Sequence, residues 1–242
     1  MFRLAAFADE ISPDPFVQAA QCARLGVQGI ELRSVGGVNV LDLSDAACRD
    51  AKRVWRDHGL RVICIGSPIG KVPVDQPWPP HLERFRIALR RAAEFEAGLI
   101  RIFSFYPGAD GATNTPEVHD RIAAMAALAT EAGVTLVHEN ERDIHGEKAV
   151  ACRALLDAGS SPSLQAAFDP ANFVQAGEDA WAAWELLRDR VAHIHIKDAL
   201  RQDGAVVPAG QGDGAVAAML CDAAARGYDG YLSLEPHLAA AG

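Results

Sequence analysis

The sequence lacks any apolar run that approaches the ~18 residues needed to cross a membrane as a helix. Its first residues, MFRLAAFADEIS, reach two acids, Asp9 and Glu10, after a short apolar stretch. This pattern is a poor signal peptide and a good first strand. We therefore expect a cytoplasmic protein that has no membrane partner.

Cysteine is scarce and does not occur in pairs. The five cysteines are odd in number and widely spaced, and no C-x-x-C pair occurs. Reduced, buried thiols are the expectation for this pattern. The sequence also has no G-x-S-x-G motif, and segment 208–214 (PAGQGDG) does not match the dinucleotide-binding pattern G-x-G-x-x-G.

Basic charge is in deficit, with 23 Lys and Arg residues against 32 Asp and Glu residues and a net charge of −9. The basic residues are scattered along helical segments instead of gathering in one patch. Because binding to nucleic-acid phosphates needs a basic footprint, we expect no nucleic-acid partner.

The chain does contain a regular alternation of strand-like and helical patterns over its 242 residues, with no linker or low-complexity tract. Strands joined by helical crossovers form a parallel sheet, and eight of them predict a closed (β/α)8 TIM barrel, an α/β fold with one domain over residues 1–242. Ser44 and Thr115 are the expected caps of two of the helices, and one helix is expected at about 178–190. The eight predicted strands are 4–8, 29–34, 61–67, 99–105, 134–140, 164–169, 193–198 and 231–235.

The last strand is followed by only seven residues after Glu235, so the eighth outer helix is predicted to be missing. We expect the flank beside the first and last strands to be less covered, and a homodimer would cover it. A monomer in light scattering at micromolar concentration would contradict this hypothesis.

Segment 193–198 (HIHIKD) alternates polar and β-branched residues, which predicts a strand. His193, His195 and Lys197 then share one face, and the two isoleucines share the other. Imidazoles and an ammonium make a poor core, so this face is expected to line a functional cavity.

Three carboxylates lie at the ends of other predicted strands, in VTLVHEN, LQAAFDP and YLSLEP. One such residue alone is usually a cap or a surface charge, but strand ends converge in a barrel. Three carboxylates and one imidazole suit a divalent ion, with Mn²⁺ expected and Mg²⁺, Co²⁺ or Zn²⁺ as alternatives. Such an ion would favour removal of a C–H proton next to a bound carbonyl, with Glu139 and Glu235 as base and acid. The predicted metal ligands are Glu139, Asp169, His195 and Glu235.

Further residues are candidates for substrate binding, each with a structural alternative. His193 lies one pleat deeper than His195 and either touches the metal or substrate or is a hydrogen-bonded residue behind them. Lys197 either orients a substrate oxygen or pairs with Asp198. Glu31 places a substrate hydroxyl, orients a metal ligand or caps a helix. Two residues are expected at the rim of the site, namely Lys71 and His237.

Six segments, in this order, resemble the xylose isomerase-like TIM-barrel superfamily, also called sugar phosphate isomerases/epimerases: GIELR, SPIGK, HEN, FDPANF, HIHIKDA and LSLEPH. The resemblance covers essentially the whole chain. It implies a Glu–Asp–His–Glu metal site on the four residues named above. In the ketose 3-epimerases of this group two glutamates exchange the proton through a cis-enediolate, a role that would fall on Glu139 and Glu235.

Three departures from the epimerase pattern leave the sugar specificity open. Asn172 stands where the epimerases have a histidine three residues after the metal-binding Asp. Arg201 is the nearest candidate for their substrate-binding arginine, and the frequent P-G-E-G turn appears here as PAGQGDG. Asn172 and Arg201 are therefore candidate substrate contacts.

The expected function is that of a metal-dependent isomerase or epimerase for a small ketose, polyol ketone or derivative. A lyase is the closest alternative, as in the inosose dehydratases or in β-elimination of C-glycosides, and a non-catalytic sugar-binding subunit is the alternative from another class. An endonuclease of the endonuclease IV type needs more histidines at strand ends and is disfavoured by the net charge of −9.

Overall fold

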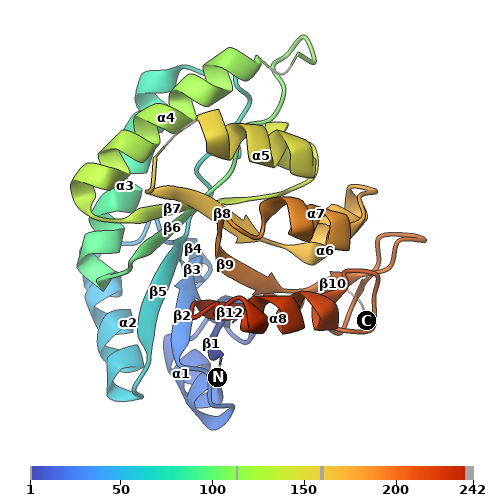
Figure 1. Cartoon of the computed structure of the whole chain (residues 1–242). Helices are drawn as coiled ribbons and strands as arrows, with labels where there is room; N and C mark the ends of the chain where they lie inside the picture. The colour runs from blue at the N-terminus through green and yellow to red at the C-terminus, as the bar shows by residue number, and fades with distance from the viewer. Residues whose placement is uncertain (1, 113, 159–160, 238–242) are drawn as a thin grey trace.

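Eight parallel strands close into a barrel in the computed structural model of this chain, which describes residues 2–112, 114–158 and 161–237 (Figure 1). Around the barrel the order is β1, β12, β9, β8, β7, β6, β5 and β2, and β2 pairs with β1 to close the ring. The barrel strands are β1 (Arg3–Ala6), β2 (Gly29–Leu32), β5 (Arg61–Gly66), β6 (Leu99–Ile102), β7 (Thr135–Glu139), β8 (Leu164–Phe168), β9 (Val191–Ile196) and β12 (Tyr231–Leu234).

Helices surround this barrel on the outside (Figure 1). The arrangement confirms the predicted (β/α)8 barrel. In the described part of the chain, no helix combines the length and the apolar character needed to cross a bilayer. The helices are α1 (Pro15–Arg24), α2 (Asp45–Asp57), α3 (Trp78–Phe95), α4 (Thr115–Ala132), α5 (Ala149–Ala158), α6 (Pro170–Gln175), α7 (Ala180–Leu187) and α8 (Val216–Ala225).

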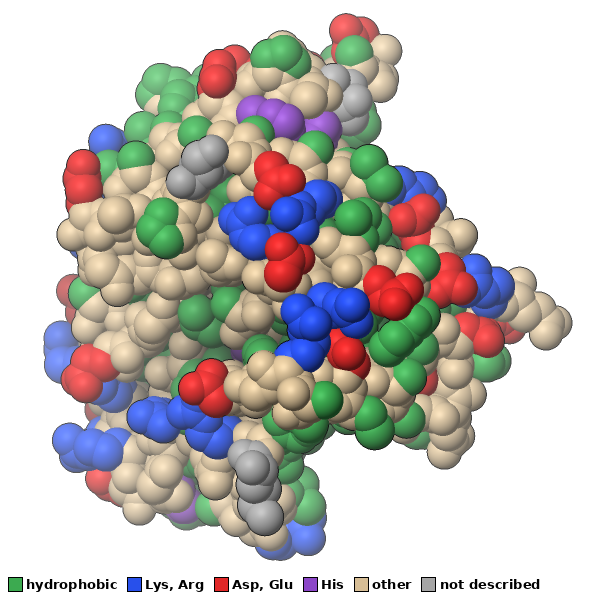
Figure 2. Space-filling view, in the orientation of Figure 1, with side chains coloured by type: hydrophobic (Ala, Val, Ile, Leu, Met, Phe, Trp, Pro, Cys, Tyr) green, Lys and Arg blue, Asp and Glu red, His purple; other side chains and the backbone are tan. Residues whose placement is uncertain are grey.

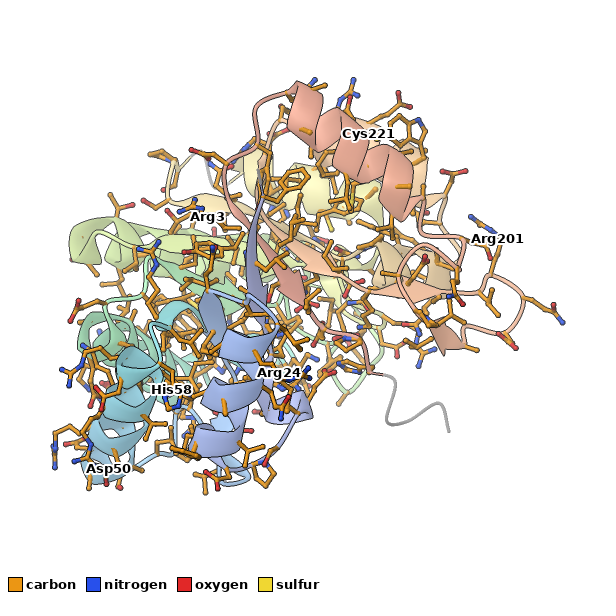
Figure 3. All side chains as sticks on the ribbon, turned by 90° about the horizontal axis from the view of Figure 1, so that it is seen from below. Arg3, Arg24, Asp50, His58, Arg201 and Cys221 are labelled. Carbon is orange, nitrogen blue, oxygen red and sulfur yellow. The ribbon has the colours of Figure 1, made fainter. Side chains whose placement is uncertain are left out.

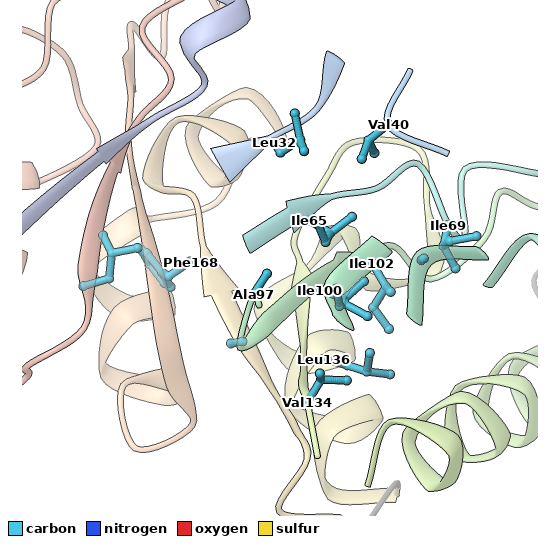
Figure 4. Packing of buried hydrophobic residues seen from close by; sticks show 14 of the residues in the cluster. Leu32, Val40, Ile65, Ile69, Ala97, Ile100, Ile102, Val134, Leu136 and Phe168 are labelled. Carbon is cyan, nitrogen blue, oxygen red and sulfur yellow. The ribbon is translucent and has the colours of Figure 1, made fainter. Parts of the chain in front are cut away.

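The main hydrophobic core lies between the strands and the helices (Figure 4). Ile65, Ile100 and Leu136 point outward from neighbouring strands and are fully buried there. Burial of one such side chain contributes about 1.5–3 kcal/mol relative to exposure. A second, smaller apolar cluster contains Cys64, Val137 and Ala167. Since residues two apart share a face of a strand, Val137 and Ala167 lie one layer deeper in the barrel than Glu139 and Asp169.

Local details differ from the sequence predictions in two places. Asn114, not Thr115, caps α4, because its Oδ1 accepts a hydrogen bond from Glu117 N. The single helix expected at about 178–190 is α7, and the preceding α6 was missed although Asp169 caps it and Pro170 occupies its first position, a regular helix start.

Short elements extend the loops at the carboxyl ends of the strands. Two are hairpins, β3 (Ser34–Val35) with β4 (Val38–Asn39) and β10 (Asp198–Ala199) with β11 (Val206–Val207). Two are 3-10 turns, η1 (Ala8–Glu10) and η2 (His145–Glu147). After β12, Pro236 and His237 are not helical. The prediction that no outer helix follows the last strand falls on residues 238–242, which lie outside the described residues.

Candidate metal centre

Four strands bring the predicted metal ligands together at the carboxyl end of the barrel. The Nδ1 atom of His195 lies 3.2 Å from Glu139 Oε1, 3.8 Å from Asp169 Oδ2 and 3.5 Å from Glu235 Oε2. All four residues are 3 % exposed or less, and one ligand atom from each lies within 4.8 Å of the others. We call these residues the four-residue cluster.

The donor atoms of this cluster fit a divalent cation. Oε2 of Glu139 and Oε2 of Glu235 are buried and accept no hydrogen bond from any described residue. Buried carboxylate oxygens that accept no hydrogen bond are costly, and an ion that prefers oxygen ligands would satisfy them. Asp169 uses Oδ1 to cap α6 and keeps Oδ2 for the cluster. The identity of the ion stays a prediction.

Glu31 lies beneath His195, on the side of the ring that faces away from the cluster. Its Oε2 is 3.2 Å from His195 Nε2 and 2.7 Å from His193 Nε2, so Nδ1 of His195 is the nitrogen that faces the cluster. A carboxylate behind a metal-binding histidine commonly fixes the ring in this way. Burial alone would lower the pKa of His195, but the charges of Glu31 and Glu139 raise it well above its ordinary value.

Two buried cations contact the carboxylates of the cluster. Lys197 Nζ is 3.3 Å from Asp169 Oδ2 and 3.0 Å from Asn172 Oδ1. The expected alternative pairing of Lys197 with Asp198 is wrong, because the Asp198 oxygens accept backbone N–H groups of the loop at residues 210–214. Asn172 also donates to Glu139 Oε1 at 3.2 Å.

The second cation, Arg101 of β6, was missed by the sequence analysis. Its Nη1 forms an ion pair with Glu139 Oε2 at 3.1 Å, and its Nε is buried without a hydrogen-bond partner in the described ranges. A signal for it existed, because Arg101 lies between Ile100 and Ile102 in an alternating strand and must therefore point into the barrel.

Cations and aromatic rings alternate across the other side of the barrel mouth. The Arg101 guanidinium lies 5.0 Å from the Phe7 ring centre and 4.9 Å from that of Phe103. Arg33 covers the outer face of Phe7 at 4.7 Å, and Lys71 covers Phe103 at 4.2 Å. Such contacts stabilise each cation and restrict its orientation. We call these five residues the cation–aromatic stack.

A cavity of about 240 Å³ opens above the cluster. A larger hollow of about 330 Å³ lies between α2, α3 and β5, away from the cluster. The residues that line the cavity are Arg33, Lys71, Arg101, Glu139, Glu141, Asn172, Gln175, Lys197, Val206, Glu235 and His237.

Not all of the predicted substrate contacts reach this cavity. Lys71, Asn172, Lys197 and His237 line it, with Lys71 paired to Glu141 at 2.6 Å. Glu31 and His193 lie beneath His195 and are fully buried. Arg201 is exposed on the outer loop between β10 and β11 and does not line the cavity (Figure 3). Substrate contact by any of them stays a prediction.

Glu235 at the cavity rim is held in its charged form. Burial raises its pKa, but the hydrogen bond with His237 and the charges of Lys197, His195 and Arg101 outweigh burial, so its pKa is lower than usual. The hydrogen bonds of His237 to Glu10 and Glu235 raise the pKa of this histidine to about 9.

The outer surface shows no broad patch of one sign on the side seen in Figure 2, where acidic and basic side chains are interspersed. The five cysteines form no disulfide, and four of them are buried. Burial of these four agrees with the expectation of buried thiols, whereas Cys221 is exposed.

The comparisons with known proteins identify the family of this chain. The family model for the xylose isomerase-like TIM barrel matches residues 19–241, so the chain belongs to that family. None of the curated proteins is matched by this sequence.

Solved structures of low sequence identity share the fold. The probable 3-DHS dehydratase AsbF from Bacillus anthracis has 17% identity and a TM-score of 0.76, covering 96% of this chain and 92% of its own. The 3-keto-D-glucoside 4-epimerase YcjR from E. coli has 16% identity and a TM-score of 0.73, and the match covers 92% of this chain and 87% of YcjR. A xylose isomerase-like TIM barrel protein from Mycobacterium smegmatis in complex with magnesium has 16% identity and a TM-score of 0.76, and the match covers 98% of this chain and 90% of that protein.

Proposed function

We propose that this protein is a divalent-metal-dependent isomerase or epimerase that acts on a small ketose, polyol ketone or derivative. The observation that carries the proposal is the four-residue cluster, in which Glu139 and Glu235 each keep one buried oxygen without a hydrogen bond beside a cavity. The family similarity to proteins named as an epimerase and as a dehydratase supports sugar-like chemistry.

The metal would be held by the four-residue cluster and would supply Lewis-acid polarisation of a carbonyl and its neighbouring hydroxyl. Glu139 lies at the end of β7 and Glu235 directly follows β12. Two other strands, β8 and β9, lie between these two strands around the barrel. One glutamate would remove the proton beside the carbonyl and the other would return one. Asn172 and His195 hold Glu139 Oε1 at 3.2 Å, and Arg33 and His237 each hold Glu235 Oε1 at 3.1 Å.

The first test is metal content per chain by mass spectrometry after dialysis against Mn²⁺, followed by a screen of ketoses and inososes for deuterium uptake from solvent. About one ion per chain is expected. Glu235→Gln should lose deuterium uptake by roughly 10²- to 10⁴-fold, the usual contribution of an acid–base group, and bind the ion much more weakly.

Glu141→Gln is the matched control, because Glu141 lines the same cavity but pairs with Lys71 outside the cluster. It should bind Mn²⁺ like the parent chain. Absence of metal from a folded parent protein would refute the proposal and would favour a non-catalytic sugar-binding protein. Loss of water from the substrate, detected as a new diketone absorbance, would identify a lyase instead.

A further inference from the structure

The cations of the cavity fall into two groups according to their partners. Arg33 has Asp9 at 2.9 Å and Glu10 at 3.3 Å, and Lys71 has Glu141 at 2.6 Å. None of these three acids belongs to the four-residue cluster. Arg33 also reaches Glu235 Oε1 at 3.1 Å, but Asp9 and Glu10 would keep Arg33 neutralised whatever binds to the cluster, as Glu141 would keep Lys71.

Arg101 and Lys197 have no carboxylate of their own in the described part of the chain. The carboxylates within 4.0 Å of Arg101 are Glu139 and Glu235. Those within 4.0 Å of Lys197 are Asp169 and Glu235. Both cations therefore share their partners with any metal ion that the cluster holds.

A divalent ion would change the charge balance at the floor of the cavity. It would take carboxylate oxygens that Arg101 and Lys197 now share with the cluster, so the two buried cations would be less neutralised than in the metal-free protein. Two further buried carboxylates have partners of their own, Glu31 with His193 at 2.7 Å and Asp198 with backbone N–H groups of the loop at residues 210–214. Because Arg101 is 5 % exposed and Lys197 is 7 % exposed, water does little to screen their two positive charges.

The guanidinium of Arg101 is prepared to bind an anion. Phe7 and Phe103 hold it from both sides, and its buried Nε has no hydrogen-bond partner in residues that the structure describes. A guanidinium fixed in this way presents a planar edge that matches a carboxylate or a phosphate. Lys197 lines the same cavity and supplies a second positive charge.

We propose that the substrate carries an anionic group, a carboxylate or a phosphate, which Arg101 and Lys197 bind at the floor of the cavity. This inference rests on the proposed function, because Arg101 and Lys197 lose part of their neutralisation only when the cluster holds a divalent ion. It narrows the substrate class to acidic or phosphorylated derivatives of a small sugar or polyol.

The test uses three probes that share one hexose skeleton and differ at C6: D-glucose, D-glucuronate and D-glucose 6-phosphate. Each is titrated calorimetrically into the Mn²⁺-loaded full chain at constant ionic strength. At least one anion should bind about 10- to 100-fold more tightly than glucose, the usual worth of a hydrogen bond to a charged group. The preferred anion distinguishes a carboxylate substrate from a phosphorylated one.

Variants then assign the site. Arg101→Gln should remove most of the preference for the anion and leave the affinity for glucose within about threefold of that of the parent chain. Lys52→Gln, which removes a cation paired with Glu96 outside this cavity, is the control and should keep the preference. Arg101→Lys and Lys197→Met, checked by thermal melting, provide further folded variants if Arg101→Gln does not fold.

Equal binding of the three probes, no binding of either anion at millimolar concentration, or an unchanged preference in folded Arg101 and Lys197 variants would overturn the inference. Metal content is measured on the same samples. Bound Mn²⁺ without a preference for anions refutes this inference alone, whereas absence of Mn²⁺ refutes it together with the proposed function.

Discussion

The two halves of the barrel mouth supply different chemical groups. The half formed by β7, β8, β9 and β12 supplies three carboxylates and a histidine that are held close together, and two of the carboxylate oxygens accept no hydrogen bond from the described residues. The half formed by β1, β2, β5 and β6, with their loops, supplies the cation–aromatic stack. The acidic half therefore attracts a cation. Arg101 is the cation of the stack whose carboxylate partners, Glu139 and Glu235, both belong to the acidic half.

The largest expected effect is loss of the histidine from the acidic half. His195→Ala should weaken Mn²⁺ binding by more than the roughly 10- to 100-fold cost of losing an outer partner of a metal ligand. Isothermal titration with Mn²⁺ measures this change. His58→Ala, which alters a half-buried histidine at the end of α2, is the control and should bind Mn²⁺ normally. Equal affinities in the two variants would remove His195 from the metal centre.

Substitution of Glu31, which lies beneath His195, should have the next largest effect on Mn²⁺ affinity. Glu31→Gln keeps the shape of the side chain but removes the charge that faces His195 Nε2 at 3.2 Å. We expect Mn²⁺ affinity to fall by about 10- to 100-fold. An unchanged affinity in a folded variant would show that Glu31 is only a structural partner of His193.

A substitution in the cationic half should change Mn²⁺ affinity in the opposite direction. Arg101→Gln removes a charge that competes with the metal for Glu139, so Mn²⁺ should bind more tightly, by up to about tenfold in a partly screened site. A variant that merely damaged the fold would bind the ion more weakly. Lys71→Gln should change the affinity less, because Glu141 already balances Lys71.

The smallest expected effect concerns the rim and the stability of the metal-free protein. The pKa of His237 rises from 6.5 to about 9, so its protonated form stabilises the fold fully below pH 6.5. That contribution is lost as pH rises through about 9. Thermal melts should show a smaller loss of stability over this range in His237→Gln than in the parent chain. Identical pH profiles would contradict the ion pairs of His237.

The sequence by itself determined the barrel and the members of the acidic half. Alternating strand and helix patterns require a parallel sheet, and the carboxyl ends of its strands converge in a barrel. Glu139, Asp169, His195 and Glu235 could therefore be selected from their places at strand ends, without any knowledge of distances. The α6 helix was missed because Asp169 was read as a metal ligand and not also as a helix cap.

Only the tertiary structure decided the cationic half and the partners of each charge. Phe7, Arg33, Lys71 and Arg101 come from four different segments, and a stack of rings and cations depends on distances that no sequence spacing contains. The same reason explains why the sequence left Lys197 between two roles. Asp198 is its neighbour in the chain, but the loop at residues 210–214 folds over Asp198 and takes its oxygens, so Lys197 turns to Asp169.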